Sequence, residues 1–237
     1  MLYYGFDLTY LVLVLPFVIF SIWASTNVNR TFKRYSNVHN QKGLTGAMAA
    51  EQVLKNNGVH NVRIEQVSGN LTDHYDPKSN VIRLSSDVYA NTSAAAIGVA
   101  CHEAGHAVQY AQNYTPIKLR TAIVPITNIG SALAMPLIFL GLVLNFMTEF
   151  SYTFVYIGIA CFGLSLLFQL ITLPVEFNAS RRAVSAIANA GILGEDELDG
   201  AKKTLRAAAL TYIAAAAVSA MQFLRLILLF GGGRDDD

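Results

Sequence analysis

The segment Asn91–Ala111, NTSAAAIGVACHEAGHAVQYA, decides how the chain is interpreted. Asn, Thr and Ser favour the cap of a helix, and mostly small apolar residues follow them, so we predict a helix over residues 93–111. On such a helix His102 and His106 project from one face, one turn apart. Their ring nitrogens can bind a single Zn²⁺ ion, so the pair makes half of a zinc site.

Glu103 lies beside the two histidines without sharing their face, which lets its carboxylate address a zinc-bound water. Zinc lowers the pKa of that water toward about 7, and Glu103 can take its proton as hydroxide attacks a peptide carbonyl. The alternative is a core helix with two hydrogen-bonded histidines, but burying so many ionisable groups without a metal is costly. The segment therefore predicts a zinc-dependent endopeptidase with Glu103 as general base.

The third zinc ligand has to be found elsewhere in the chain, because catalytic zinc normally has three protein ligands. No histidine follows His106, so we expect a carboxylate. Glu149 would lie across the membrane, and the acidic cluster at 195–199 is typical of a solvated helix start. Glu176 directly follows an apolar segment and is the best candidate, although stabilisation of a helix N-terminus is an alternative role for its charge.

The composition indicates a membrane protein. Of the residues, 53% are hydrophobic and 14% are charged, whereas soluble domains carry about 25% charged residues. Four apolar segments are long enough for transmembrane helices, at 8–24, 122–147, 152–175 and 207–230. We expect a mainly α fold, in which these helices join a small α+β cytoplasmic zinc-peptidase domain at 25–121 and a cytoplasmic helical segment at 176–206 that carries the third ligand. Residues 62–67 and 80–85 should form a short β-hairpin in that domain.

The basic residues predict the orientation. All 17 Lys and Arg except Arg225 and Arg234 lie between the first two predicted spans or between the last two, and basic loops favour the cytoplasm. We therefore expect a multi-pass protein of the bacterial inner membrane whose active site faces the cytoplasm. A net charge of +1, with no basic and aromatic patch, argues against nucleic acid as a partner. Polypeptide substrates and the lipid bilayer are the expected partners, with membrane-protein partners or a homo-oligomer left open.

Two sequence motifs and the predicted layout of spans resemble those of a known family. The HEAGH helix, the segment LPVEFNASRR at residues 173–182 and the four-span layout resemble the neutral zinc metallopeptidases of the YugP-like membrane family. More distantly, the chain is similar to gluzincin-type membrane proteases related to the CAAX-processing and heat-shock HtpX enzymes. The resemblance implies Zn²⁺ as cofactor and Glu176 as third ligand. In the distant relatives an Asp supports the ligands four residues later, where this chain has Ser180.

Ser180 can hydrogen-bond a ligand histidine but supplies no charge, so Asn178, Asp73 or Asp76 are alternative residues for orienting the site. Peptidases of this kind also need a donor for the developing oxyanion. Tyr212 is the candidate, with Arg181 and Arg182 as competitors, and a membrane-interface anchor is the alternative role for this tyrosine. The strand at 81–85 resembles the edge strand along which such peptidases bind substrate, or it is an ordinary hairpin edge.

Two other functions stay open at this level. One is an intramembrane zinc protease, because residues 94–108 are nearly all apolar, although that stretch is short and flanked by polar residues. The other is a catalytically silent membrane scaffold that holds zinc for structural reasons. Loss of cleavage on replacing Glu103 distinguishes an enzyme from such a scaffold.

Overall fold

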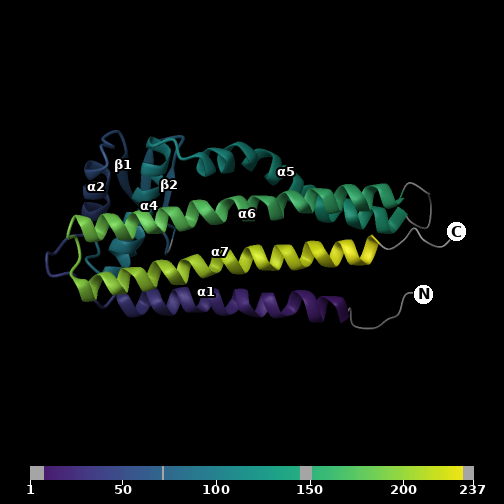
Figure 1. Cartoon of the computed structure of the whole chain (residues 1–237), viewed down its shortest axis with the longest axis horizontal. Coiled ribbons are helices and arrows are strands. Elements are labelled where there is room, and N and C mark those ends of the chain that lie inside the picture. The colour runs from purple at the N-terminus through teal and green to yellow at the C-terminus, as the bar shows by residue number, and fades with distance from the viewer. Residues whose placement is uncertain (1–7, 71, 145–150, 232–237) are drawn as a thin grey trace. The chain divides into compact units, whose positions relative to one another are not determined.

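The computed structural model describes residues 8–70, 72–144 and 151–231, and these residues are mainly helical (Figure 1). Glu149 and the last three residues of the second predicted span lie outside the described residues. The helices are η1 Tyr10–Val14, α1 Leu15–Tyr35, α2 Gly46–Asn56, α3 Ser86–Tyr89, α4 Ala94–Ala111, α5 Thr115–Leu144, α6 Ser151–Asn189 and α7 Glu195–Phe230; the strands are β1 Arg63–Val67, β2 His74–Asp76 and β3 Val81–Ser85.

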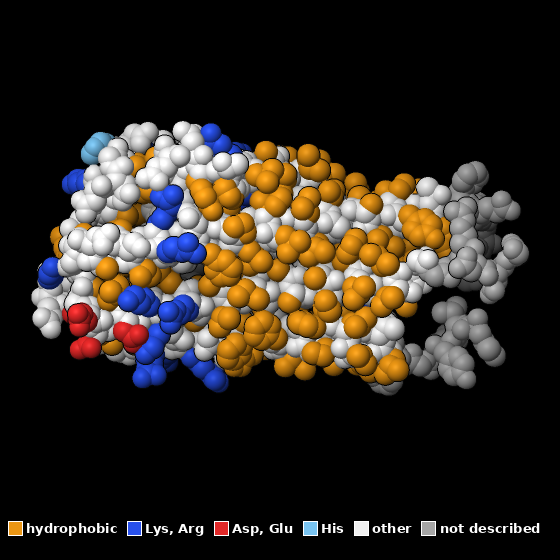
Figure 2. All heavy atoms as spheres, viewed as in Figure 1, with side chains coloured by type: hydrophobic (Ala, Val, Ile, Leu, Met, Phe, Trp, Pro, Cys, Tyr) orange, Lys and Arg blue, Asp and Glu red, His pale blue; other side chains and the backbone are white. Residues whose placement is uncertain are grey.

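Among the described residues, four helices are long and apolar enough to cross a membrane: η1 with α1, and then α5, α6 and α7. Their most apolar windows have mean hydropathies of 1.9 to 2.2, and less than a third of each window is buried inside the protein. Exposed hydrophobic side chains cover the visible faces of these helices (Figure 2). Ile22, Ile129, Phe139 and Leu228 are among the exposed hydrophobic residues of the four helices. A helix that keeps its apolar side chains on the outside is suited to lipid.

All four helices are longer than the apolar segments in the sequence. α6 continues through Glu176 to Asn189, and α7 begins at Glu195, well before its apolar part. Acidic residues in the first turn of α7 suit the positive end of the helix dipole. The predicted domain bounds stay predictions, because a helix end does not mark where lipid ends.

By its internal packing the chain divides into two units. The helical unit comprises Met1–Trp23, Leu119–Leu173 and Tyr212–Asp237, and the sheet unit comprises Ala24–Lys118 and Pro174–Thr211. In the helical unit, Ile138, Val155, Ile159 and Leu226 form a small buried cluster. The sheet unit contains β1, β2, β3, α2, α3 and α4 together with the ends of the long helices.

The three strands form one sheet in the order β1-β3-β2. β2 and β3 are antiparallel neighbours, so they form a β-hairpin, whereas β1 pairs with β3 in parallel. The predicted hairpin of residues 62–67 with 80–85 is therefore wrong. β3 is also not an edge strand: Val81, Ile82 and Leu84 are fully buried, and such a strand belongs in the middle of a sheet. The edge strand β2 packs against α4.

α4 is the central helix of the sheet unit. Its N-cap Ser93 accepts a hydrogen bond from the backbone N–H of Ala96, as the sequence predicted. Fourteen of its 18 residues are buried, and α4 packs against α2, β2 and β3. Ala183 and Ile187 of α6 belong to the same core. Small side chains allow this close packing, so α4 is held from several sides while it carries the histidine motif.

Candidate metal centre

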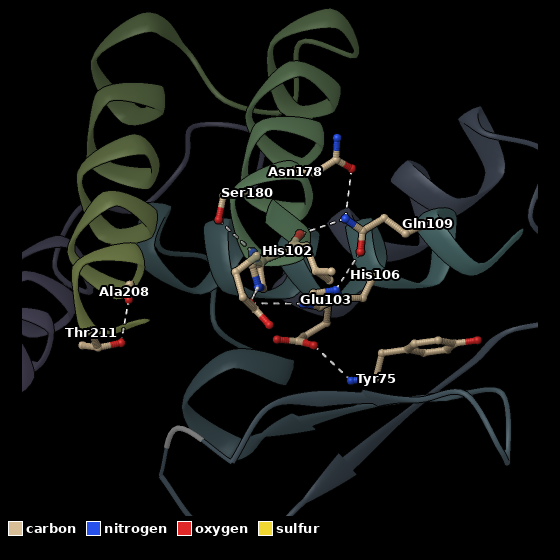
Figure 3. A network of polar contacts seen from close by, with 11 residues as sticks. Tyr75, His102, Glu103, His106, Gln109, Asn178, Ser180, Ala208 and Thr211 are labelled. Carbon is tan, nitrogen blue, oxygen red and sulfur yellow. Dashed lines mark hydrogen bonds and ion pairs between the residues drawn. The ribbon is translucent and has the colours of Figure 1, made fainter. Parts of the chain in front are cut away.

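His102 and His106 of α4 meet Glu176 of α6 inside the sheet unit. Glu176 Oε2 lies 3.2 Å from His102 Nε2 and 3.4 Å from His106 Nε2. Glu176 is only 3% exposed, so its carboxylate is withdrawn from water. Figure 3 shows the two histidines and the residues around them. The structure thus brings together the three residues that were predicted from the sequence as zinc ligands.

The spacing of these atoms suits a zinc ion. Ligand atoms at about 2.0–2.1 Å from a tetrahedral zinc stand about 3.3 Å apart, and the two nitrogen–oxygen distances are 3.2 and 3.4 Å. Two imidazole nitrogens and one carboxylate oxygen are also the donor set that catalytic zinc commonly uses. Three ligands leave a fourth position open for water or substrate.

The electrostatics of the site favour a cation. Burial lowers the pKa of His106, whereas its hydrogen bond to Glu176 and the negative charges of Glu103 and Glu176 raise that pKa. The raising effects together are larger, so the pKa of His106 lies above its ordinary value. The surroundings therefore stabilise positive charge at this point. A divalent cation would satisfy the same carboxylates, with both imidazoles neutral.

Each histidine has a partner at its second ring nitrogen, Nδ1. Ser180 Oγ lies 3.1 Å from Nδ1 of His102, which confirms the contact expected of Ser180. Gln109 Oε1 lies 3.0 Å from Nδ1 of His106. Partners of this kind orient a ligand ring so that Nε2 faces the metal.

Sequence reasoning missed Gln109. The signal was present, because Gln109 lies three residues after His106, on the same helix face, and is a polar residue in an otherwise apolar stretch. The two acids considered for this role bind elsewhere: Asp73 accepts from Ser85, and Asp76 accepts from Ser79 and Arg83. Burial raises the pKa of Asp73, and the charge of Glu103 adds to that effect.

Glu103 lies between the metal group and the sheet. Its Oε2 accepts a hydrogen bond of 3.0 Å from the backbone N–H of Tyr75 in the edge strand β2. One oxygen is thereby held, and the carboxylate keeps further lone pairs for a proton. Strand β2 therefore orients Glu103 as well as forming the edge of the sheet.

Cys101 is adjacent to His102 in sequence but does not suit a metal ligand. It is fully buried, and burial raises the pKa of its thiol far above the ordinary value. Zinc binds the thiolate rather than the thiol. The donor set is therefore better described by nitrogen and oxygen than by sulfur.

The three candidates for oxyanion stabilisation are placed differently. Tyr212 follows Thr211, the last residue of the sheet unit, and belongs to the helical unit, so its catalytic role stays a prediction. Arg182 donates to Asn178 and Gln112 and lies 5.9 Å from the ring centroid of Tyr114. Arg181 is exposed.

Gly105 lets the two ligand-bearing helices approach each other. A Cβ atom at this position would lie 2.8 Å from the backbone oxygen of Ala179 on α6. We expect Gly105→Ala to push α6 away from α4, with a loss of about 1–3 kcal/mol in the free energy of unfolding and a lower zinc content. Thermal unfolding in detergent and metal analysis would measure the two effects.

Gly98 on the same helix provides the comparison. Its added Cβ would meet atoms of Ala201 at 3.3 to 3.5 Å, so Gly98→Ala should cost less stability and leave the metal content nearer to that of the wild type. A Gly105→Ala protein with wild-type stability and full zinc content would contradict the close approach described for α4 and α6.

Comparison with known proteins relates the chain to a family and to a relative in Bacillus subtilis. Residues 10–231 match a family described as "Putative neutral zinc metallopeptidase". The chain is also 46% identical over 217 residues to the "Putative membrane protease YugP" of Bacillus subtilis (strain 168), a match that covers 92% of this chain and 94% of that protein. No solved structure matches the chain significantly.

Proposed function

Because the chain belongs to the family of neutral zinc metallopeptidases, we propose that it is a membrane endopeptidase whose zinc is held by His102, His106 and Glu176. The observation that supports this most strongly is the convergence of three buried or nearly buried ligand atoms from two helices. The four apolar helices, together with the similarity to a membrane protease, indicate that the chain is a membrane protein.

Glu103 is proposed as the general base. When bound, zinc lowers the pKa of a water molecule and polarises the carbonyl of the peptide bond. Glu103 takes the proton of the attacking water and passes it to the leaving amine, which is the work of a positioned carboxylate. The hydrogen bond from the Tyr75 N–H holds the carboxylate in place for both transfers. His102, His106 and Glu176 would hold the metal.

This proposal is tested by one comparison. Purified wild-type protein in detergent is expected to contain zinc and to cleave an unfolded polypeptide, whereas Glu103→Gln is expected to contain zinc and to cleave the same polypeptide at least about 10²-fold more slowly. A catalytically silent scaffold would give the same absence of cleavage in both proteins. Equal cleavage by both proteins would show that Glu103 is not the base.

An intramembrane protease is less well supported. α4 is not among the four candidate spans, and the whole ligand group belongs to the sheet unit. We therefore propose that the site acts on polypeptide segments at the membrane surface, such as exposed parts of membrane proteins or misfolded chains.

We further propose that the sheet unit faces the cytoplasm of a bacterial cell. It contains Arg30, Lys33, Arg34, Lys202, Lys203 and Arg206, and Lys and Arg side chains gather on the visible face of this unit (Figure 2). Basic residues next to transmembrane helices favour the cytoplasmic side.

The orientation is tested with single cysteines at two positions. We expect Lys55→Cys, exposed on α2, to react with a membrane-impermeant maleimide only after the cells are permeabilised, and Glu149→Cys to react in intact cells. The wild type is the control, because Cys101 is buried and Cys161 is only partly exposed. The reverse pattern of labelling would contradict a cytoplasmic site.

A further inference from the structure

Gln109 is a fully buried polar residue whose amide oxygen and nitrogen both make hydrogen bonds. Its Oε1 lies 3.0 Å from His106 Nδ1, and its Nε2 donates to the backbone oxygen of Val175 and to Asn178 Oδ1, both at 2.9 Å. Figure 3 shows this amide between α4 and α6. The proposed proton transfers do not involve Gln109, so its hydrogen bonds to His106, Val175 and Asn178 indicate another role.

The contacts allow only one orientation of the Gln109 amide. A backbone carbonyl accepts and never donates, so the NH₂ group must face Val175 and the oxygen must face His106. An amide oxygen accepts and never donates, so His106 must carry its proton on Nδ1. In the neutral imidazole, which is the form that binds a metal, the lone pair then lies on His106 Nε2, the nitrogen that faces Glu176 Oε2.

The orientation of Asn178 is fixed in the same way. Arg182 Nε donates to Asn178 Oδ1 at 2.6 Å, and a guanidinium has no acceptor. The same oxygen therefore accepts from both Arg182 and Gln109. The direction of each hydrogen bond in the series Arg182, Asn178, Gln109, His106 follows from the donor-only group at its start.

We propose that Gln109, held by Asn178 and Arg182, is a positioning residue that fixes the ring and tautomer of His106 for metal binding. This inference rests on the proposed function, since it has consequences only if His106 binds zinc. His102 differs, because its partner Ser180 has a hydroxyl that both donates and accepts, and this hydroxyl does not by itself dictate a tautomer. The ligand pair is thus constrained more strongly at His106.

Two substitutions at Asn178 separate hydrogen bonding from packing. Asn178→Leu removes the acceptor, and we expect zinc affinity to fall by about tenfold or more, within the range of about 10–100-fold that loss of such a partner costs. Asn178→Asp keeps an oxygen that accepts from both neighbours, and its affinity should stay within about threefold of the wild type. Zinc dissociation constants are measured by competition with a chelating dye, with kcat and KM as second readouts.

Two further variants complete the series. Gln109→Met fills the same space without an amide and should weaken zinc binding at least as much as Asn178→Leu. Gln112→Leu is the control, because it removes the exposed partner of Arg182 and leaves the bonds of Asn178 and Gln109 in place, so zinc affinity should be unchanged. Thermal unfolding of the zinc-free proteins shows whether each variant is folded, and the Asn178 pair decides the question if Gln109→Met is not.

The outcomes are distinct. Wild-type affinity in both Asn178→Leu and Gln109→Met would overturn the inference, as would an equal loss in Asn178→Leu and Asn178→Asp, which would assign Asn178 a packing role. A wild-type protein that binds no zinc would instead refute the proposed function itself.

Discussion

Glu103→Gln is expected to lower kcat by about 10²–10⁴-fold, the usual contribution of a general base, while zinc stays bound. The amide has nearly the shape of the carboxylate, and its oxygen can still accept the N–H of Tyr75 that Glu103 accepts. It cannot take a proton from water at neutral pH. Cleavage of a labelled unfolded polypeptide measures the rate, and elemental analysis measures zinc in the same sample.

A matched control is Glu51→Gln. Glu51 is an exposed glutamate of the same unit that pairs with Lys55, so this change should leave rate and zinc content as in the wild type. If Glu103→Gln lost zinc together with activity, Glu103 would belong to the structure of the site rather than to its proton transfers. Retention of wild-type cleavage would remove Glu103 from the mechanism.

Glu176→Ala is expected to have the second large effect, on zinc binding itself. It removes one of three donor atoms and the negative charge that faces both imidazoles. The loss of zinc affinity should exceed the roughly 10–100-fold that removal of a supporting partner costs. Competition with a chelator measures the affinity, and activity should fall with zinc occupancy.

The control for Glu176 comes from the rival acidic cluster. Asp196→Ala removes an exposed acid at the start of α7 and should leave zinc affinity unchanged. An undiminished affinity in Glu176→Ala would reject Glu176 as third ligand. A loss in Asp196→Ala instead would move that role to the cluster at 195–199.

The features that sequence predicted well are local. Ser93 and the small residues after it specify where α4 begins, and the four-residue spacing places His102 and His106 together whatever surrounds them. Glu176 was predicted by elimination, because no histidine follows His106 and because Glu149 would lie across the membrane. In both cases residue type and spacing alone limited the possibilities to a few.

The features that sequence did not predict depend on distant contacts. β1 pairs directly with β3, although β2 lies between them in the sequence. Alternation of apolar residues does not reveal which strand lies in the middle of a sheet. The role of Gln109 depends on the carbonyl of Val175 and the side chain of Asn178, 66 and 69 residues later. Only the packing of α6 against α4 brings these groups together.

X-ray absorption at the zinc edge of the purified wild-type protein tests the metal site most directly. The ligand set His102, His106 and Glu176 predicts nitrogen and oxygen neighbours at about 2.0–2.2 Å, with the outer-shell scattering of two imidazoles. A sulfur neighbour at about 2.3 Å, or a single imidazole, would contradict it.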